Sequence, residues 1–456
     1  MKKQMDMTSG NLLKKIILFS VPIILSSMLQ HLYTAVDLAV VGKFCGKESL
    51  AAVGSTNGLT GLITNLFIGI SVGVNVLVAR SVGRKDYEKV EKIVHTAVLF
   101  SFFAGILLMI FGISTARFWL ELMETTAESI DGATIYLQIY FSGMIFSMMY
   151  NYGAAILRAI GETKKPLYIL SASGIINVIL NLIFVIFFKL DVVGVALATV
   201  ISQAVSCIRI LLYLMKTDSV VQLNLKKLQM NFKIVGEMVW IGLPAGIQSS
   251  LFSISHVVMQ SAVNSFNSSI VVAGNTAASN IESFVYASMN AYSQASTTFT
   301  SQNYGARNLK NCKKSLIYSL ICVFVSGAVF GLIALTFARP LLSIYNTDVE
   351  VIAVGIKRMT VICLTYYLCG MMDVFVGGMR GLGYSVVPMV FSLLGAVGFR
   401  IIWVATVFQA NHTLETLYLA YPLSWIVTIV AHLTCYLIIY HIVKRKFLQE
   451  GTIKDV

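Results

Sequence analysis

The prolines of this chain reveal an internal repeat. Pro22 pairs with Pro244 and Pro166 pairs with Pro388, and each pair is separated by 222 residues. Other uncommon residues keep the same offset without a gap, which is typical of a duplicated segment. The further pairs are Gly83 and Gly305, Lys92 and Lys314, Gly105 and Gly327, Arg158 and Arg380, and Gly161 and Gly383. The sequence therefore predicts two halves of similar structure.

Apolar residues dominate both halves. Hydrophobic residues make up 57% of the chain and charged residues only 12%, whereas soluble domains carry about 25% charged residues. Many apolar runs are long enough to cross a hydrocarbon layer about 30 Å thick as helices. These runs are predicted at 16–41, 53–78, 93–113, 133–157, 167–188, 193–215, 234–263, 272–300, 316–337, 352–379, 387–408 and 415–441. We therefore expect an all-α integral membrane protein with twelve transmembrane helices.

The number of spans in each half determines how the repeats are related. Six spans return the chain to the side on which it entered, so the second copy enters from the same side as the first. The halves are then parallel repeats related by a pseudo-two-fold axis along the membrane normal, an arrangement common in secondary transporters. We predict an N-terminal six-helix lobe at 1–215, an amphipathic cytoplasmic linker at 216–233 and a C-terminal six-helix lobe at 234–456.

The distribution of positive charge predicts the orientation. The chain has a formal net charge of +13, and most of its Lys and Arg residues lie in alternate loops. These loops are assigned to the cytoplasm by the positive-inside rule, which places both termini there. The charge is thereby explained by topology, and no nucleic-acid partner is expected. We predict a multi-pass protein of the bacterial inner (plasma) membrane that contacts membrane lipids.

The sequence shows no motif for catalysis or for a bound cofactor. The 7 cysteines are scattered and lack the Cys-x-x-Cys spacing of metal sites. His-Glu-x-x-His and Gly-x-Ser-x-Gly are absent too, so no hydrolase chemistry is indicated. We expect neither a catalytic residue nor a metal site nor a cofactor, and any uphill transport would draw on an ion gradient.

Asp37 is the strongest single candidate for a functional residue. A carboxylate inside a predicted span is costly and usually faces water, a partner or a transport path. Tyr33, Gln30 and Ser26 precede it by 4, 7 and 11 residues, so all four share one face of a helix. The repeat-equivalent position of Asp37 is Met259. The charge thus belongs to one half only, as expected for an ion site built in one lobe.

Two amides in the fifth predicted span are spaced to join Asp37. Asn177 and Asn181 lie one helical turn apart and could supply hydrogen bonds or amide oxygens to a carboxylate. Bridging of helices within lipid explains the same spacing equally well. Coupling to a proton and coupling to sodium are both chemically open at such a carboxylate.

Further candidates lie in the second half. Glu282, Asp373 and Arg400 are charges within predicted spans, and one interpretation is a buried ion pair of Arg400 with Glu282 or Asp373. The alternative is a second coupling site. The span at 272–300 also carries many polar residues, Tyr286 among them, and is expected to border a cavity.

Several of these features together resemble the multidrug and toxic compound extrusion (MATE) family. They are the twelve spans in two halves, the segment from Pro22 to Asp37, Leu50-Ala-Ala-Val-Gly54, and an Arg-x-x-Gly-x4-Pro signature in each half. The resemblance covers nearly the whole chain, and Asp37 is similar to the first-span aspartate of the branch typified by the DNA-damage-inducible protein F. It implies a central cavity between two lobes that opens alternately to each side. It also implies a monomeric antiporter that uses H+ or Na+ to export amphipathic, often cationic compounds.

The resemblance also implies a cation-coupling site in the amino-terminal lobe. Its positions correspond to Asp37, Asn151, Asn177, Asn181 and Thr199. The chain departs from the family pattern at Asn181, where that pattern has a second carboxylate, so protonation of Asp37 alone stays open beside sodium binding. The expected substrate-cavity residues are Gln30, Tyr33, Glu282, Tyr286, Asp373 and Arg400.

Two other functions compete with this interpretation. A flippase for a lipid-linked saccharide precursor would share the architecture, but it would need several buried cations for a pyrophosphate. An integral-membrane transferase would need clustered carboxylates or histidines at one membrane face. The sequence shows neither pattern clearly.

Overall fold

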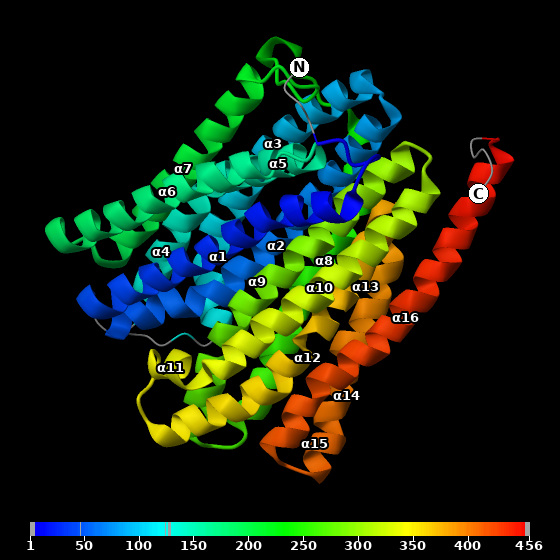
Figure 1. Cartoon of the computed structure of the whole chain (residues 1–456). Helices are drawn as coiled ribbons and strands as arrows, with labels where there is room; N and C mark the ends of the chain where they lie inside the picture. Colours follow the sequence, from blue (N-terminus) through cyan, green and yellow to red (C-terminus); the bar gives the residue numbers. More distant parts are fainter. Residues whose placement is uncertain (1–4, 46, 124, 126–128, 452–456) are drawn as a thin grey trace. The chain divides into compact units, whose positions relative to one another are not determined.

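The computed structural model describes residues 5–45, 47–123, 125 and 129–451 (Figure 1). Regular structure within these ranges is helical throughout. The elements of the first half are α1 (Leu12–Phe44), α2 (Lys47–Arg84), α3 (Tyr87–Leu122), α4 (Ile130–Ser142), α5 (Met144–Ala159), α6 (Lys164–Leu182), the π-helix η1 (Ile183–Phe187) and α7 (Asp191–Lys216). A short 3-10 helix, η2 (Leu225–Lys227), follows α7.

The second half repeats this order with small variations. Its elements are α8 (Phe232–Asn264), α9 (Ser269–Gly305), α10 (Leu309–Thr336), α11 (Ala338–Ser343), α12 (Val349–Gly381), α13 (Val386–Ser392), the π-helix η3 (Leu393–Gly398), α14 (Phe399–Ala405), α15 (Val407–Ala410) and α16 (Leu414–Gln449). In this half α9 packs extensively against both α10 and α12.

Contacts divide the chain into two compact units. The first unit contains Met28–Gly246, and the second contains Met7–Ser27 together with the chain from Ile247 onward. Helices α1 and α8 therefore each contribute residues to both units, and the division follows Pro22 and Pro244 closely. The lobe boundaries inferred from the sequence, 1–215 and 234–456, stay a prediction.

The twelve expected spans each correspond to a helix or to consecutive helices. By length and hydropathy alone, 10 helices of the described chain qualify as spans. The expected span at 133–157 is divided at Gly143 into α4 and α5, so neither piece is long enough to qualify. The expected span at 272–300 lies in α9, whose many Ser, Thr and Asn residues make it the least apolar of the long helices. The first difference follows from the interruption at Gly143, and the second follows from the polarity of α9.

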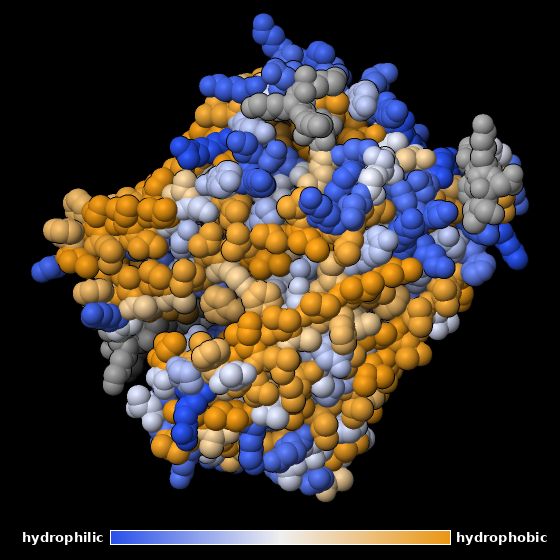
Figure 2. All heavy atoms as spheres, in the orientation of Figure 1, coloured by the Kyte–Doolittle hydropathy of each residue, from blue (hydrophilic) through white to orange (hydrophobic). Residues whose placement is uncertain are grey.

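The outer surface fits a lipid environment. Figure 2 shows apolar residues over much of the visible surface. On α3, the large side chains of Phe103, Leu107 and Phe118 are each more than half exposed, at 55%, 59% and 59%. A soluble protein rarely exposes large contiguous apolar patches, so these side chains are expected to contact the acyl chains of lipids.

The turn before the third span is the same in both halves. Lys85 and Arg307, which are 222 residues apart, have positive φ angles of 61° and 60°. The next residues, Asp86 and Asn308, each accept a backbone N–H in the first turn of α3 and α10. Side-chain caps of this kind satisfy backbone donors that a helix start leaves free. The repeat inferred from the 222-residue spacing is thus present in backbone geometry.

A second repeated turn contains the two Arg-x-x-Gly-x4-Pro signatures. Gly161 and Gly383 follow the ends of α5 and α12 with φ angles of 83° and 96°, a region in which a side chain is disfavoured. Pro166 and Pro388 then lie in the first turn of α6 and α13. Proline is tolerated there because the N–H it lacks has no partner within the helix.

Two pairs of glycines bring α2 and the first part of α8 together within the first unit. A methyl group on Gly69 would overlap the backbone of Gly246, and one on Gly242 would overlap the backbone of Ile70. Gly73 lies equally close to the carbonyl of Met238. Small residues at a spacing of four allow backbones to approach in this way in membranes.

The expected linker at 216–233 crosses the start of α3. The backbone of Asn224 lies 3.0 Å from Nε2 of His95, and the backbone N–H of Asn231 donates to Thr96 Oγ1. Val221 and Leu223 are buried against the core of the first unit. This segment is therefore attached to the helices by both hydrogen bonds and apolar contacts.

Candidate functional site

Asp37 begins a chain of polar side chains that crosses three helices. The Asn181 amide, on α6, donates a hydrogen bond to Asp37 Oδ1 on α1. The same amide donates to Asn177 Oδ1 at 3.3 Å, and the Asn177 amide donates to Thr199 Oγ1 on α7 at 3.4 Å. The Thr199 hydroxyl, at the end of the chain, donates to the backbone carbonyl of Val195 at 3.0 Å. Four of the expected coupling residues are thus brought together.

The surroundings of this chain are apolar. Val40, Val41, Tyr136, Val185 and Val195 form a buried cluster contributed by α1, α4, η1 and α7. Asn177 is 5% exposed and Asn181 is 0% exposed, while Asp37 is half-buried. Burying polar groups in such surroundings costs free energy unless they are hydrogen-bonded. The hydrogen bonds of the chain therefore reduce the cost of burying these side chains.

Two oxygens in the described part of this site accept no hydrogen bond. Among the described residues, Asn181 Oδ1 is fully buried and accepts no hydrogen bond. Within the described part of the chain, Asp37 accepts a hydrogen bond at Oδ1 but not at Oδ2. Carboxylate and amide oxygens are the ligands that hard cations take, and a protonated carboxylate could donate to an amide oxygen. The donor set at α1 and α6 is therefore chemically suited to a small cation or a proton.

Tyr33 lies one turn before Asp37 and contacts the same neighbour. Its hydroxyl donates to the carbonyl of Ser171 at 3.3 Å, and its ring packs over Gly174, where a methyl group would overlap it. Tyr33 and Asp37 thus share the face of α1 that packs on α6, as the helical spacing predicts.

Two expected residues lie outside the polar chain. The Asn151 amide donates to the carbonyl of Ser147 in its own helix, α5, at 2.8 Å. Gln30 is exposed, and in the described structure its side chain forms no hydrogen bond with Asp37 or the two asparagines. The structure therefore does not join Asn151 or Gln30 to Asp37.

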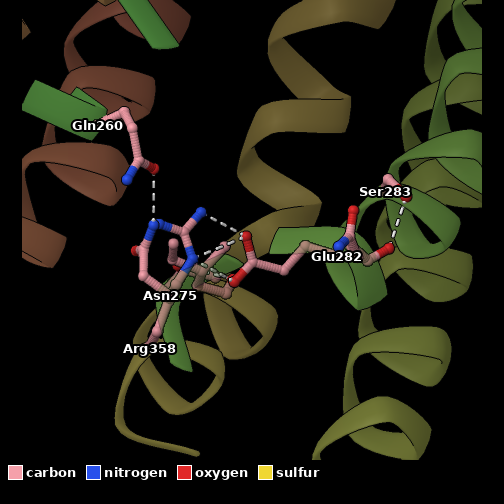
Figure 3. Close-up of polar contacts among 8 residues, drawn as sticks. Gln260, Asn275, Glu282, Ser283 and Arg358 are labelled. Atoms are coloured by element: carbon pink, nitrogen blue, oxygen red, sulfur yellow. Dashed lines mark hydrogen bonds and ion pairs between the residues drawn. The ribbon is translucent and has the colours of Figure 1, made fainter. Parts of the chain in front are cut away.

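A second polar network is buried in the second unit. Arg358 on α12 donates to both carboxylate oxygens of Glu282 on α9, through Nε at 3.0 Å and a terminal nitrogen at 2.7 Å. Its other terminal nitrogen donates to Asn275 Oδ1 at 2.7 Å, and the Asn275 amide donates to Gln260. Figure 3 shows these side chains converging from three helices. Every charge of the pair is matched within this network.

Arg400 does not form the ion pair that the sequence offered as one interpretation. Glu282 is paired with Arg358 instead, and in the described structure no carboxylate lies within ion-pair distance of Arg400. Its guanidinium lies over the rings of Tyr421, at 4.4 Å, and Trp425, at 5.9 Å. Its Nε donates to Ser424. Aromatic faces therefore supply part of the stabilisation that a carboxylate would give.

Asp373 and Tyr286, both expected cavity residues, contact each other. The Tyr286 hydroxyl donates to Asp373 Oδ2 at 3.0 Å, and the Asn290 amide donates to the same hydroxyl at 3.4 Å. The two residues link α9 to α12. The candidates of the second half thus separate into three groups around Arg358, Arg400 and Asp373.

Arg358 is the residue that the sequence interpretation missed. It lies six positions after the first residue of the expected span at 352–379, so a charge within a span was available as a signal. Among the described residues, no group of three or more His, Cys, Asp or Glu side chains is placed to hold a metal ion.

Comparison with known proteins decides the family. The MatE family model matches residues 22–183 and 244–406, which begin at Pro22 and Pro244 and therefore coincide with the two repeats. The chain belongs to the MatE family. Its members are membrane transporters and not enzymes, so the chain is a multi-pass transporter in which no catalytic residue is required.

Individual relatives of this MatE chain cover it almost end to end. It is 28% identical over 421 residues to the probable multidrug resistance protein YoeA of Bacillus subtilis, covering 90% of each chain. It is 24% identical to the probable multidrug resistance protein NorM of Thermotoga maritima, covering 84% of this chain and 82% of the relative. A solved outward-facing MATE transporter superposes with a TM-score of 0.90 over 97% of this chain and 100% of that chain, at 21% identity. The twelve-helix fold is shared with that structure.

Proposed function

We propose that this MatE chain is an antiporter that exports amphipathic, often cationic compounds and is coupled to H+ or Na+ at Asp37. The observation that carries the proposal is the polar chain from Asp37 through Asn181 and Asn177 to Thr199, together with the unpaired oxygen of Asn181. Relatives named as multidrug resistance proteins support the substrate class. The protein would act as a monomer in the plasma membrane, with both termini in the cytoplasm.

The hydrogen bonds suggest how an ion would act on the helices. The carboxylate of Asp37 accepts from Asn181 and thereby ties α1 to α6. A proton or cation on Asp37 removes or redirects this acceptance, so the amide of Asn181 reorients. Its neighbours Asn177 and Thr199 share the same chain, and the change therefore reaches α7. An ion shifts the balance between the inward-open and outward-open states only if it binds them with different affinity. A change in the contact between Asp37 and Asn181 would supply that difference.

The buried cations do not favour the competing flippase function. A pyrophosphate site needs several free guanidinium or ammonium groups. Arg358 is neutralised by Glu282, and Arg400 lies against Tyr421 and Trp425. The second unit thus offers fewer free charges than its arginines suggest.

The direct test is gradient-driven efflux of a cationic dye from proteoliposomes. Asp37→Asn should abolish efflux driven by a proton gradient and by a sodium gradient, each imposed separately. The matched control is Asp131→Asn, since Asp131 is an exposed carboxylate in the same half and pairs with Arg117. Undiminished efflux by Asp37→Asn, or equal loss in the control, would reject Asp37 as the coupling residue. The wild-type response to each gradient identifies the ion.

A further inference from the structure

A groove lies between the start of α6 and the end of α7, away from the polar chain at Asp37. Its volume is about 380 Å³, and it is lined by Lys165, Tyr168 and Ile169 of α6 and by Arg209, Leu212, Tyr213 and Lys216 of α7. The two helices pack side by side in the first unit (Figure 1). Three of the seven lining residues are cations, and the others are aromatic or aliphatic.

The cations of this groove are free to bind an anion. In the described structure none of Lys165, Arg209 and Lys216 forms an ion pair with a carboxylate. Lys165 Nζ lies 5.6 Å from the ring centroid of Tyr213, which holds the ammonium group beside the groove. Arg209 and Lys216 are exposed. Grouped cations that lack carboxylate partners attract phosphate groups, and arginine binds phosphate in a bidentate manner.

An apolar stripe continues from the groove along both helices. On α6, Tyr168 is followed at helical spacing by Ile175 and Ile179, which are 58% and 51% exposed. On α7, Leu212 is preceded at the same spacing by Ile208, which is 54% exposed, and by Ile201. Residues spaced by four and seven share one helix face, so the cations lie at one end of a continuous apolar surface. Figure 2 shows apolar residues over this part of the view.

We propose that this groove binds the headgroup of an anionic phospholipid whose acyl chains lie along the apolar stripe of α6 and α7. Charge complementarity selects the anionic headgroup, and the stripe selects a ligand with apolar tails. A free phosphate would leave the stripe uncovered, and a zwitterionic lipid would leave the cations poorly matched. The positive-inside rule places this end of the helices in the cytoplasm, where anionic lipids attract basic segments.

The test measures lipid binding to the purified full-length protein by native mass spectrometry. Phosphatidylglycerol and phosphatidylcholine are titrated separately, with excess inorganic phosphate as a competitor in a further arm. The wild type should prefer phosphatidylglycerol, and phosphate should not displace it. For Lys165→Gln/Arg209→Gln/Lys216→Gln, the apparent Kd for phosphatidylglycerol should rise on the order of tenfold or more, since each cation contributes measurably near a lipid surface.

Two further variants make the result specific. The charge-matched control is Lys310→Gln/Lys313→Gln/Lys314→Gln, which removes three cations from α10, and it should bind phosphatidylglycerol like the wild type. Ile175→Gln/Ile208→Gln keeps the cations but makes the stripe polar, and it should also weaken binding. If the groove variant elutes as an aggregate, the two exposed substitutions Arg209→Gln/Lys216→Gln replace it.

Three outcomes would overturn the proposal. The first is unchanged phosphatidylglycerol binding by the groove variant. The second is an equal loss in the α10 control, which indicates general electrostatic attraction. The third is full displacement by inorganic phosphate with no effect of the stripe variant, which indicates an anion site without a lipid. Dye efflux is not the readout, so failure of this proposal and failure of the Asp37 proposal are distinguishable.

Discussion

Arg358 binds Glu282 through both carboxylate oxygens, and the two side chains are 6% and 4% exposed. The pair joins α12 to α9 and extends through Asn275 to Gln260 on α8. Two charges removed from water are tolerated because each is matched by the other and by further hydrogen bonds. The second unit therefore contains a balanced ion pair, and the partner of Glu282 is Arg358 and not Arg400, which the sequence had offered as one interpretation.

Breaking this pair should destabilise the protein strongly. Arg358→Met leaves the Glu282 carboxylate buried without a cation, and a loss of about 3–5 kcal/mol is expected. The adjacent substitution Lys357→Met is the matched control, since Lys357 forms an exposed pair with Glu415 and should cost less than about 1 kcal/mol. Thermal midpoints in detergent compare the two. The double variant Glu282→Leu/Arg358→Met should recover most of the loss, and equal midpoints for both single variants would contradict this account.

Asn181→Asp should create a stronger sodium response. The new carboxylate would contact Asp37 across the position of the present hydrogen bond, and two carboxylates at such a distance repel unless a proton or cation lies between them. Sodium should therefore raise the thermal midpoint of this variant more than that of the wild type, because a ligand that binds only the folded state stabilises it.

Asn151→Asp is the matched control for that experiment. The Asn151 amide bonds to the Ser147 carbonyl in its own helix and is not joined to Asp37. A carboxylate at 151 should therefore give no additional sodium response. Equal sodium shifts for the two aspartate variants would show that added charge alone is responsible.

Gly69→Ala should disrupt the approach of α2 to α8. The added methyl group would overlap the Gly246 backbone, and overpacking of this kind costs about 1–3 kcal/mol. In the same helix, a methyl group at Gly54 would meet nothing within 4 Å. Gly54→Ala should therefore be neutral or stabilising by up to about 1 kcal/mol, as helix propensity predicts. The thermal midpoint should fall for Gly69→Ala and should stay unchanged or rise for Gly54→Ala.

The repeated turns allow a test in both halves. Gly161→Ala and Gly383→Ala should each cost about 1–2 kcal/mol, because φ is 83° and 96° at these positions and a Cβ atom is disfavoured there. Lys85→Gly removes the same strain at a φ of 61°, so it should be stabilising by less than about 1 kcal/mol. Thermal unfolding of the three variants measures this. Similar costs at the two glycines are expected if the repeated turns are energetically equivalent.

Much of the scaffold could be predicted from the sequence because its signals are local. The 222-residue offset predicted equivalent turns, and the structure places matching caps at Asp86 and Asn308 and matching positive φ angles at Gly161 and Gly383. Twelve apolar runs predicted twelve spans, although Gly143 divides one and α9 is too polar for a hydropathy criterion. Helical spacing also placed Tyr33 and Asp37 on one face.

The partners of the buried charges were harder to predict because pairing joins residues far apart in the chain. Arg358 and Arg400 both lie within apolar spans, and nothing local distinguishes the arginine that meets Glu282 from the one that lies over Tyr421 and Trp425. Asn151 and Asn181 are likewise both amides within spans. Only Asn181 contacts Asp37, because α6 and not α5 presents its amide to that face of α1.

The sequence by itself determined the membrane environment, the two similar halves, the equivalent turns and the absence of a carboxylate at Met259, the repeat equivalent of Asp37. These properties depend on hydropathy, on spacing along a helix and on the conformational needs of glycine and proline. The tertiary structure alone decided that Asp37 meets Asn181, that Glu282 meets Arg358, and that Lys165, Arg209 and Lys216 surround one groove. Such contacts depend on how helices rotate and pack against one another, and a side chain's partner is selected only when those faces meet.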